Sequence, residues 1–200
     1  MERSVNFTTR EVQATLDGRK TMFRKVIKIN FEKVYKVACF KGKWNEVYGK
    51  SLPEHLIEWY VKEKVKPPYQ VGDVIWVRET WCGIEGYYLY KADNDDWSSV
   101  LTDADTLKWR SPVTMPREAA RLILTVKSRR VERLQSISEE DAWNEGARIA
   151  KSIEWDKLIP GLRTMCRDIL FVNMWNSTNL KRGHGWDKNN WVWVTEFEKG

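Results

Sequence analysis

The stretch VGDVIWVRE, residues 71–79, decides the fold class, because it places an apolar strand directly after a turn. Gly72-Asp73 is a turn signal. The residues from Val74 to Val77 are all apolar, so we expect both faces of this strand to be buried within a sheet. Polar residues follow only at its end, where Arg78 precedes Glu79. Two interpretations stay open for these two residues: charged groups that open into a cleft, or an ion pair at the rim of a barrel.

The same kind of pattern predicts the other elements of the chain. Strands are expected at 26–29, 87–90, 122–126 and 191–197, the last with tryptophan and valine alternating on two buried faces. Helices are expected at 9–17, 56–65, 138–146 and 158–175. The order of these elements has no βαβ periodicity, which predicts an α+β fold: a small mixed β-barrel of five to six strands decorated by three to four helices. We expect a single domain over residues 1–200, with insertions at 30–68 and 91–110.

Two helix ends carry explicit capping signals. Thr8 and Glu11 have the spacing of a capping box, and Gly18 fits the position just after the helix. Ser138 stands before an acidic first turn, and Gly146 is placed to end that helix. The first helix therefore delivers the chain into the basic segment Arg19-Lys20-Thr21-Met22-Phe23-Arg24-Lys25.

Charge and aromatic content point toward polyanions. The chain of 200 residues has 34 Lys and Arg against 28 Asp and Glu, and it contains 12 tryptophans. Residues 18–50 alone hold ten cations and two acids. A basic surface attracts polyanions, and flat rings stack on nucleobases. The alternative is that the aromatic side chains fill a β-rich core while the lysines are solvated on the surface.

Composition argues against several other classes of protein. The three cysteines are far apart and form no C-x-x-C pair, so we expect neither a zinc site nor a disulfide framework, and no other cofactor. No apolar run approaches the roughly 18 residues that a membrane-spanning helix needs, and no apolar segment of a secretory signal follows Met1. We therefore expect a cytoplasmic protein without a membrane partner.

Four segments, taken in order, resemble the ASCH domain family of the PUA-like superfamily. They are Gly18-Arg19-Lys20-Thr21 after a helix, the stretch 72–79, Arg133-Leu134, and the capped helix 138–146. Met115-Pro116-Arg117 and Trp191-Val192-Trp193-Val194 resemble a larger subgroup of that family found in bacteriophages and prophages, which would place the protein in the cytoplasm of a host. The resemblance implies a barrel with a cleft that takes RNA, a single base or a nucleoside.

Some members of this family are amidohydrolases that act on acetylated cytidine with a Lys, a Thr and a Glu. The resemblance places the Lys at Lys20 and the Glu at Glu145. The position of the Thr, three residues after the Lys, is Phe23, which has no hydroxyl to act as a nucleophile. Thr21 is the adjacent hydroxyl, so the candidate catalytic residues are Lys20, Glu145 and Thr21.

Our first hypothesis is a binding module for RNA, other single-stranded nucleic acid or a modified nucleoside. A basic cleft with an aromatic wall would supply charge, stacking faces and acceptors for base-edge hydrogens. The candidate binding residues are Arg19, Arg24, Lys25, Arg78, Glu79, Trp81, Arg117 and Trp186. The second hypothesis is a metal-independent hydrolase, either an acetylcytidine-type amidohydrolase or a ribonuclease, in which Lys20 and Glu145 share the acid and base roles. A third is a phage protein that binds a host protein through exposed tryptophans.

Overall fold

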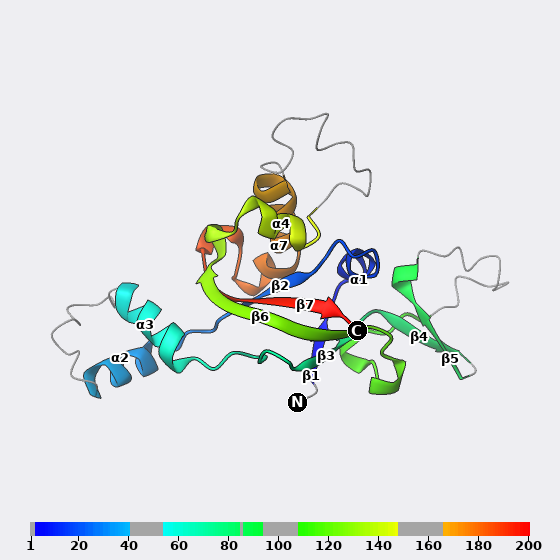
Figure 1. Ribbon diagram of the computed structural model, residues 1–200, viewed down its shortest axis with the longest axis horizontal. Coiled ribbons are helices and arrows are strands. Elements are labelled where there is room, and N and C mark those ends of the chain that lie inside the picture. Colours follow the sequence, from blue (N-terminus) through cyan, green and yellow to red (C-terminus); the bar gives the residue numbers. More distant parts are fainter. Residues whose placement is uncertain (1–2, 41–53, 85, 94–107, 148–165) are drawn as a thin grey trace.

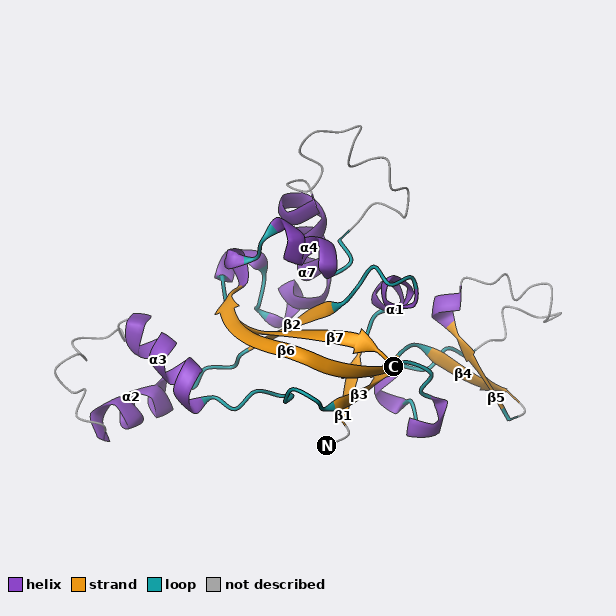
Figure 2. Cartoon of the chain, in the orientation of Figure 1, coloured by secondary structure: helices purple, strands orange, loops and turns teal. Residues whose placement is uncertain are grey.

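The computed structural model describes residues 3–40, 54–84, 86–93, 108–147 and 166–200. One curved sheet of five strands forms the body of the molecule, and helices pack on it and around its ends (Figures 1 and 2). Strand β1 pairs with β3 in parallel, and the other neighbours are antiparallel. In sheet order the strands are β1 (Arg3–Asn6), β3 (Val74–Arg78), β6 (Ile123–Arg133), β7 (Trp191–Lys199) and β2 (Met22–Val26).

The predicted α+β class is confirmed by this sheet and its helices. A second sheet is the hairpin of β4 (Trp81–Ile84) and β5 (Tyr87–Tyr90), so the described strands number seven rather than five or six. The described ladders leave β1 and β2 as the two edges of the larger sheet. Closure of the sheet into a barrel therefore stays a prediction.

Burial of the strands follows the sequence pattern in one case and departs from it in another. Residues 191–195 of β7 are all buried, as the two-sided pattern predicts. In β3 only Ile75 and Val77 are buried, while Val74 is 37% exposed and Trp76 is half-buried. The expectation that both faces of β3 are buried is therefore wrong, because the face that carries Val74 and Trp76 is partly open to solvent.

Two apolar clusters lie on opposite faces of the sheet. One includes Phe7, Phe23 and Phe197, and the other includes Met22, Phe171 and Trp175. Successive residues of a strand point to opposite faces, so β2 contributes Phe23 to the first cluster and Met22 to the second. The second cluster is covered by α4 (Glu139–Asn144) and α7 (Val172–Asn179), whereas α1 (Thr9–Leu16) packs on the first.

The predicted helix caps are present. The Thr8 side chain accepts a hydrogen bond from the Glu11 N–H, and the Glu11 carboxylate accepts one from the Thr8 N–H in return. The Ser138 hydroxyl accepts from the Asp141 N–H at the start of α4. Gly18 and Gly146 have positive φ angles of 69° and 89°, which glycine adopts at little cost where a helix ends.

One projecting part lies within the predicted insertion at 30–68, and the other, the β4–β5 hairpin, precedes the predicted insertion at 91–110. Helices α2 (Phe31–Phe40) and α3 (Glu54–Lys64) pack against each other at one end of the molecule (Figure 1). The β4–β5 hairpin projects at the other end and leads into the short 3₁₀ helix η2 (Lys91–Asp93). Residues 41–53 and 94–107 of these insertions lie outside the described residues. The single-domain organisation stays a prediction.

The remaining elements differ from the expected boundaries. Strand β6 continues past the predicted end at 126 through a bulge and reaches Arg133. The first part of the helix expected at 158–175 lies outside the described residues, and its second part is a π-helical turn, Cys166–Phe171, that continues into α7. Short 3₁₀ helices fill the connections: η5 (Pro112–Thr114), η6 (Arg117–Ala119), η7 (Leu134–Ser136), η9 (Leu180–Arg182) and η10 (Trp186–Lys188). None of the described helices combines the length and the apolar character needed to cross a bilayer.

The turn before β3 gives a pH-dependent contribution to stability. The Gln70 N–H donates to the Asp73 carboxylate over 2.9 Å, and this hydrogen bond holds the pKa of Asp73 below its ordinary value of about 3.9. Because the folded pKa is depressed, the contribution is present above that value and is lost as the pH falls through the folded pKa. We expect the difference in unfolding free energy between the wild type and Asp73→Asn to be largest above pH ~5 and to shrink toward zero in stronger acid. Urea unfolding at a series of pH values measures it, and a constant difference would contradict the assignment.

Candidate functional site

Lys20 and Glu145, 125 positions apart in the sequence, lie side by side in the structure. They form an isolated antiparallel bridge, and the Thr21 N–H donates to the Asn144 carbonyl over 2.8 Å. This pairing joins the chain that leaves α1 to the end of α4. A Cβ on Gly146 would lie 3.0 Å from the Ala14 Cβ, so glycine at 146 permits the close approach of α4 to α1.

The Lys20 ammonium is fully enclosed by its partners. Its side chain is 0% exposed, and Nζ lies 3.1 Å from Glu145 Oε2 and 3.4 Å from Glu11 Oε1. Nζ also donates to the Glu145 carbonyl over 3.2 Å and lies 5.5 Å from the centroid of the Phe7 ring. A buried ammonium needs such partners because the loss of hydration is costly.

Arg24 places a second cation on the same carboxylate. Its Nη1 donates to Glu145 Oε1 over 2.7 Å, and its Nη2 donates to Glu132 over 2.6 Å and to Asp141 over 2.8 Å. Burial opposes the charge of Arg24, but Glu145 and Glu132 outweigh it, so the pKa of this guanidinium lies above its ordinary value. The Glu145 side chain is 4% exposed and has one cation on each oxygen.

Arg130 extends this network toward the surface of the sheet. Its guanidinium donates to Glu132 over 2.9 Å, to Glu196 over 2.7 Å and also to Asp141. Burial again opposes the positive charge, and Glu132 and Asp141 more than compensate it, so the pKa of Arg130 is raised. Glu132 and Asp141, two of the three acids that hold Arg24, are thus themselves held by Arg130.

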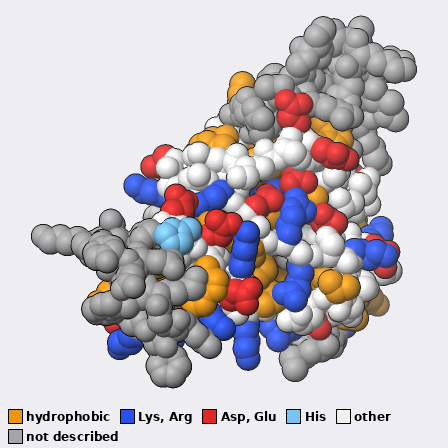
Figure 3. All heavy atoms as spheres, turned by 60° about the vertical axis from the view of Figure 1, so that its left-hand side comes forward, with side chains coloured by type: hydrophobic (Ala, Val, Ile, Leu, Met, Phe, Trp, Pro, Cys, Tyr) orange, Lys and Arg blue, Asp and Glu red, His pale blue; other side chains and the backbone are white. Residues whose placement is uncertain are grey.

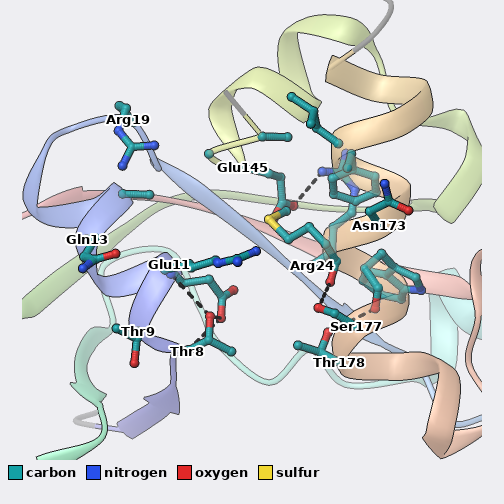
Figure 4. Close-up of a pocket in the computed structure, with 18 of the residues that line it drawn as sticks. Thr8, Thr9, Glu11, Gln13, Arg19, Arg24, Glu145, Asn173, Ser177 and Thr178 are labelled. Carbon is teal, nitrogen blue, oxygen red and sulfur yellow. Dashed lines mark hydrogen bonds and ion pairs between the residues drawn. The ribbon is translucent and has the colours of Figure 1, made fainter. Parts of the chain in front are cut away.

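A pocket of about 790 Å³ lies above this charged floor, between α1 and α7. Polar side chains of α1 and its cap stand on one side and those of α7 on the other (Figure 4). Phe171 and Trp175 form the aromatic wall of the lining, with ring centroids 6.2 Å apart and planes inclined by 29°; Phe171 is fully buried and Trp175 is 6% exposed. The pocket is lined by Thr8, Thr9, Arg10, Glu11, Gln13, Ala14, Arg19, Arg24, Glu145, Gly146, Ala147, Leu170, Phe171, Asn173, Met174, Trp175, Ser177, Thr178 and Asn179.

Sequence reasoning missed the contribution of α7 to this pocket. Phe171 and Trp175 are four residues apart, as are Asn173 and Ser177, so the helix presents an aromatic row and a polar row. The sequence pattern predicts a helix over 158–175, but none of these residues is among the candidate site residues. The alternation of Asn173 and Ser177 with Phe171 and Trp175 could have indicated that this helix lines a pocket, because a helix that only packs on the core does not need polar residues so close to its aromatic ones. Trp175 is fixed by its indole N–H, which donates to the His184 carbonyl over 2.7 Å.

The structure brings some of the predicted site residues together. Arg24 and Glu145 line the pocket as its charged floor, with Lys20 enclosed behind Glu145, and Arg19 lines the pocket while pairing with Asp17 over 2.9 Å. The neighbouring predicted residues Thr21 and Lys25 are exposed, and neither lines the pocket. Lys25 lies on the opposite face of the sheet, where Nζ is 5.7 Å from the centroid of the Tyr69 ring. Phe23 is 4% exposed within an apolar cluster.

The other predicted binding residues lie elsewhere, and none of them lines the pocket. Arg78 and Arg117 both lie against the Trp76 ring. Trp81 is buried beneath the guanidinium of Arg110. Trp186 packs edge-on against Phe171, with ring centroids 6.0 Å apart.

Glu79 supports the ion-pair interpretation of the end of β3. It is 1% exposed and forms a bidentate pair with Arg121 over 2.9 and 3.0 Å. Burial raises the pKa of Glu79, and Arg121 opposes this rise. Arg121 also reaches Asp93 over 2.5 Å, so this cluster ties η2 to the sheet.

Charged side chains on one face of the molecule and the candidate metal ligands among the described residues bear on other possible sites. Over the face that carries the projecting helices, cationic and anionic side chains are interspersed rather than gathered into one basic patch (Figure 3). Within the described ranges of the chain, no group of three or more His, Cys, Asp or Glu side chains is placed to hold a metal ion.

Comparison with solved structures found a likeness, whereas comparison with family models and curated proteins did not. No model of a protein family matches the chain, and no curated protein matches it. A high-resolution crystal structure of an ASCH domain from Lactobacillus crispatus JV V101 does match, at 12% identity and a TM-score of 0.40, over 99% of this chain and 79% of that chain. The chain is similar in structure to an ASCH domain. That is the family which the sequence motifs resemble. At this TM-score the likeness assigns neither a site residue nor an activity to this chain.

Removal of the shared carboxylate should destabilise the fold. We expect Glu145→Ala to lower the unfolding free energy by about 3–5 kcal/mol, because it leaves Lys20 and Arg24 buried without their common counter-charge. The matched control is Glu63→Ala, an exposed acid of α3, which should change stability by no more than about 0.5 kcal/mol. Chemical denaturation of both variants measures the effect. A loss below about 1 kcal/mol for Glu145→Ala would mean that water solvates the two cations.

Proposed function

We propose that this chain binds a nucleobase, presented by single-stranded RNA or as a modified nucleoside, in the pocket between α1 and α7. One observation carries this proposal: a pocket between polar side chains of α1 and α7, with the buried rings of Phe171 and Trp175 in its lining, lies over a carboxylate with fixed partners. A base can use these elements, because its edge forms directional hydrogen bonds with polar side chains and its ring packs against an apolar lining. The motifs that resemble the ASCH family imply the same class of ligand.

The size of the pocket suits one nucleoside. Pockets that enclose small molecules generally have volumes of about 300–1,000 Å³, and this one is about 790 Å³. A single base with its sugar fits such a space, whereas a duplex does not. The ligand is therefore an unpaired nucleotide or a free nucleoside.

The charged floor favours recognition of a base over binding of a phosphate. Each carboxylate oxygen of Glu145 accepts one hydrogen bond from a cation and retains a further lone pair. These lone pairs can accept from an exocyclic amine of a base. Because Lys20 and Arg24 hold the carboxylate in place before the ligand arrives, binding requires little reorganisation. The Asn173 amide and the Gln13 amide flank this floor in the pocket lining.

Hydrolysis of an acetylated nucleoside has weaker support than binding. The 3.1 Å contact of Lys20 with Glu145 resembles an acid–base pair, and this contact keeps hydrolysis as a second candidate. A base must reach the proton that it removes, yet Lys20 is enclosed and does not line the pocket. Phe23, which stands at the family's Thr position, packs in the core.

The host-protein alternative also has weaker support. It requires exposed tryptophans as anchors, but Trp81 is buried and Trp186 is half-buried against Phe171. Trp97 lies outside the described residues.

A blocked pocket should abolish nucleoside binding. We expect Ser177→Trp to remove binding by filling the space with an indole, and Asn173→Ala to weaken binding about two- to tenfold through the loss of one hydrogen bond. The matched control is Leu180→Trp, an exposed position just beyond α7 that does not line the pocket. Calorimetric titration with a panel of plain and modified nucleosides measures the affinities. Unchanged affinity in Ser177→Trp would place the ligand elsewhere.

Turnover separates the binding module from the hydrolase. We expect the wild type to bind N4-acetylcytidine without releasing acetate, because the position of the hydroxyl nucleophile holds Phe23. Chromatographic detection of cytidine checks this, with Phe23→Thr as the variant that restores a hydroxyl. Steady acetate release by the wild type that disappears in Lys20→Met, with the variant still folded, would replace the binding proposal by the hydrolase.

A further inference from the structure

The outer face of β3 carries an aromatic ring that lies outside both the core and the pocket. Trp76 stands on the side of the strand opposite to Ile75 and Val77, which are buried in the core. Its neighbours across the sheet are Ser4 of β1 and Ile123 of β6. Val74 on the same face is 37% exposed, so this part of the sheet is open to solvent. A large ring on an open sheet face is a feature that a core does not require.

Two guanidinium groups lie on this ring. The Arg78 Cζ is 4.7 Å from the Trp76 ring centroid, and the Arg117 Cζ is 5.7 Å from it. Arg78 comes from the same strand and its Nη1 donates to the Val113 carbonyl over 3.3 Å, while Arg117 comes from η6 and is exposed. The Arg78 Nε–H is buried without a hydrogen-bond partner among the described residues. Arginine is suited to such a position because its planar group both stacks and binds oxyanions.

We propose that Trp76, Arg78 and Arg117, here called the Trp76 face, bind single-stranded nucleic acid. A base stacks on the Trp76 ring or on a guanidinium plane above it, and the N–H groups of the arginines hold the adjacent phosphates. Stacking on an aromatic platform is tolerant of sequence, so this face contributes affinity rather than selectivity. An acidic peptide offers negative charge to the two arginines, but its carboxylates provide no flat ring to stack on Trp76.

The Trp76 face lies close to the pocket along the chain. Asn6 of β1 pairs with Arg78, and the Phe7 N–H donates to the Arg78 carbonyl over 2.9 Å. Thr8, two residues after Asn6, lines the pocket. At about 3.3 Å per extended residue, these two residues span about 7 Å. The two sites are thus attached to backbone positions two residues apart. That one strand spans both rests on the proposed function, whereas binding at the Trp76 face itself does not.

Binding of a short fluorescein-labelled single-stranded RNA, followed by anisotropy, tests the Trp76 face. We expect Trp76→Leu to weaken RNA binding about 5- to 150-fold through the loss of one stacked base, and Trp76→Phe to weaken it less. Arg78→Lys should also weaken it, because the charge remains while the planar group is lost. Arg117→Gln should reduce the slope of log affinity against log salt by about one. The affinity of a free nucleoside for the pocket should stay unchanged in every variant.

The control is Tyr87→Leu, which removes a 76% exposed ring from the β4–β5 hairpin and should leave RNA binding unchanged. Circular dichroism and thermal melting verify the fold, and if Trp76→Leu fails to fold, Arg78→Lys and Arg117→Gln carry the test. Unchanged RNA affinity in the folded variants overturns the proposal. Competition by an acidic polypeptide with the same dependence on Trp76 also overturns it. RNA binding that depends on Trp76, without any nucleoside binding, supports the Trp76 face while rejecting the pocket proposal.

Discussion

The carboxylate of Glu145 fixes the relation between two parts of the chain that are remote in sequence. It accepts from Lys20 on one oxygen and from Arg24 on the other, while the backbone beside it bridges to Lys20. Three charged groups in a small volume are costly to bury, and the cost is offset only because each has partners in good geometry. The same contacts hold α4 against the end of α1 and so set the floor of the pocket. The site and the packing of this part of the fold therefore depend on one anion.

The two-residue period of β2 explains why the basic segment does not form a single basic cleft. Arg24 points toward α4 and α7 and meets three acids, whereas Lys25 points to the other face and lies exposed beside Tyr69. Cations that are adjacent in the sequence therefore lie on opposite faces of the sheet. The surplus of cations in residues 18–50 overstated the positive charge available at the pocket, because Lys20 and Arg24 are neutralised by acids from other segments.

Local signals were predictable from the sequence, and long-range ones were not. The capping box at Thr8 and Glu11 and the turn at Gly146 depend on residues a few positions apart, and the structure has both. The contact of Lys20 with Glu145 was anticipated through the resemblance, because no local pattern joins positions so far apart. The aromatic wall of α7 stayed hidden because Trp175 serves the core and the pocket together. Arg130 was missed because its role depends on acids that β6, α4 and β7 bring together.

The end of β3 shows how adjacent residues serve two separate tasks. Arg78 points outward to Trp76, and Glu79 points inward to Arg121, which also holds Asp93 of η2. The carbonyl of Ala92, the residue before Asp93, accepts a hydrogen bond from the Gln13 amide on the pocket wall. The start of α1 is tied to the same strand end by the hydrogen bond from Phe7 to Arg78. The pocket wall and the Trp76 face are thus joined by short polar contacts, so a ligand that touches both meets surfaces already fixed relative to each other, and little of its binding free energy goes into ordering them.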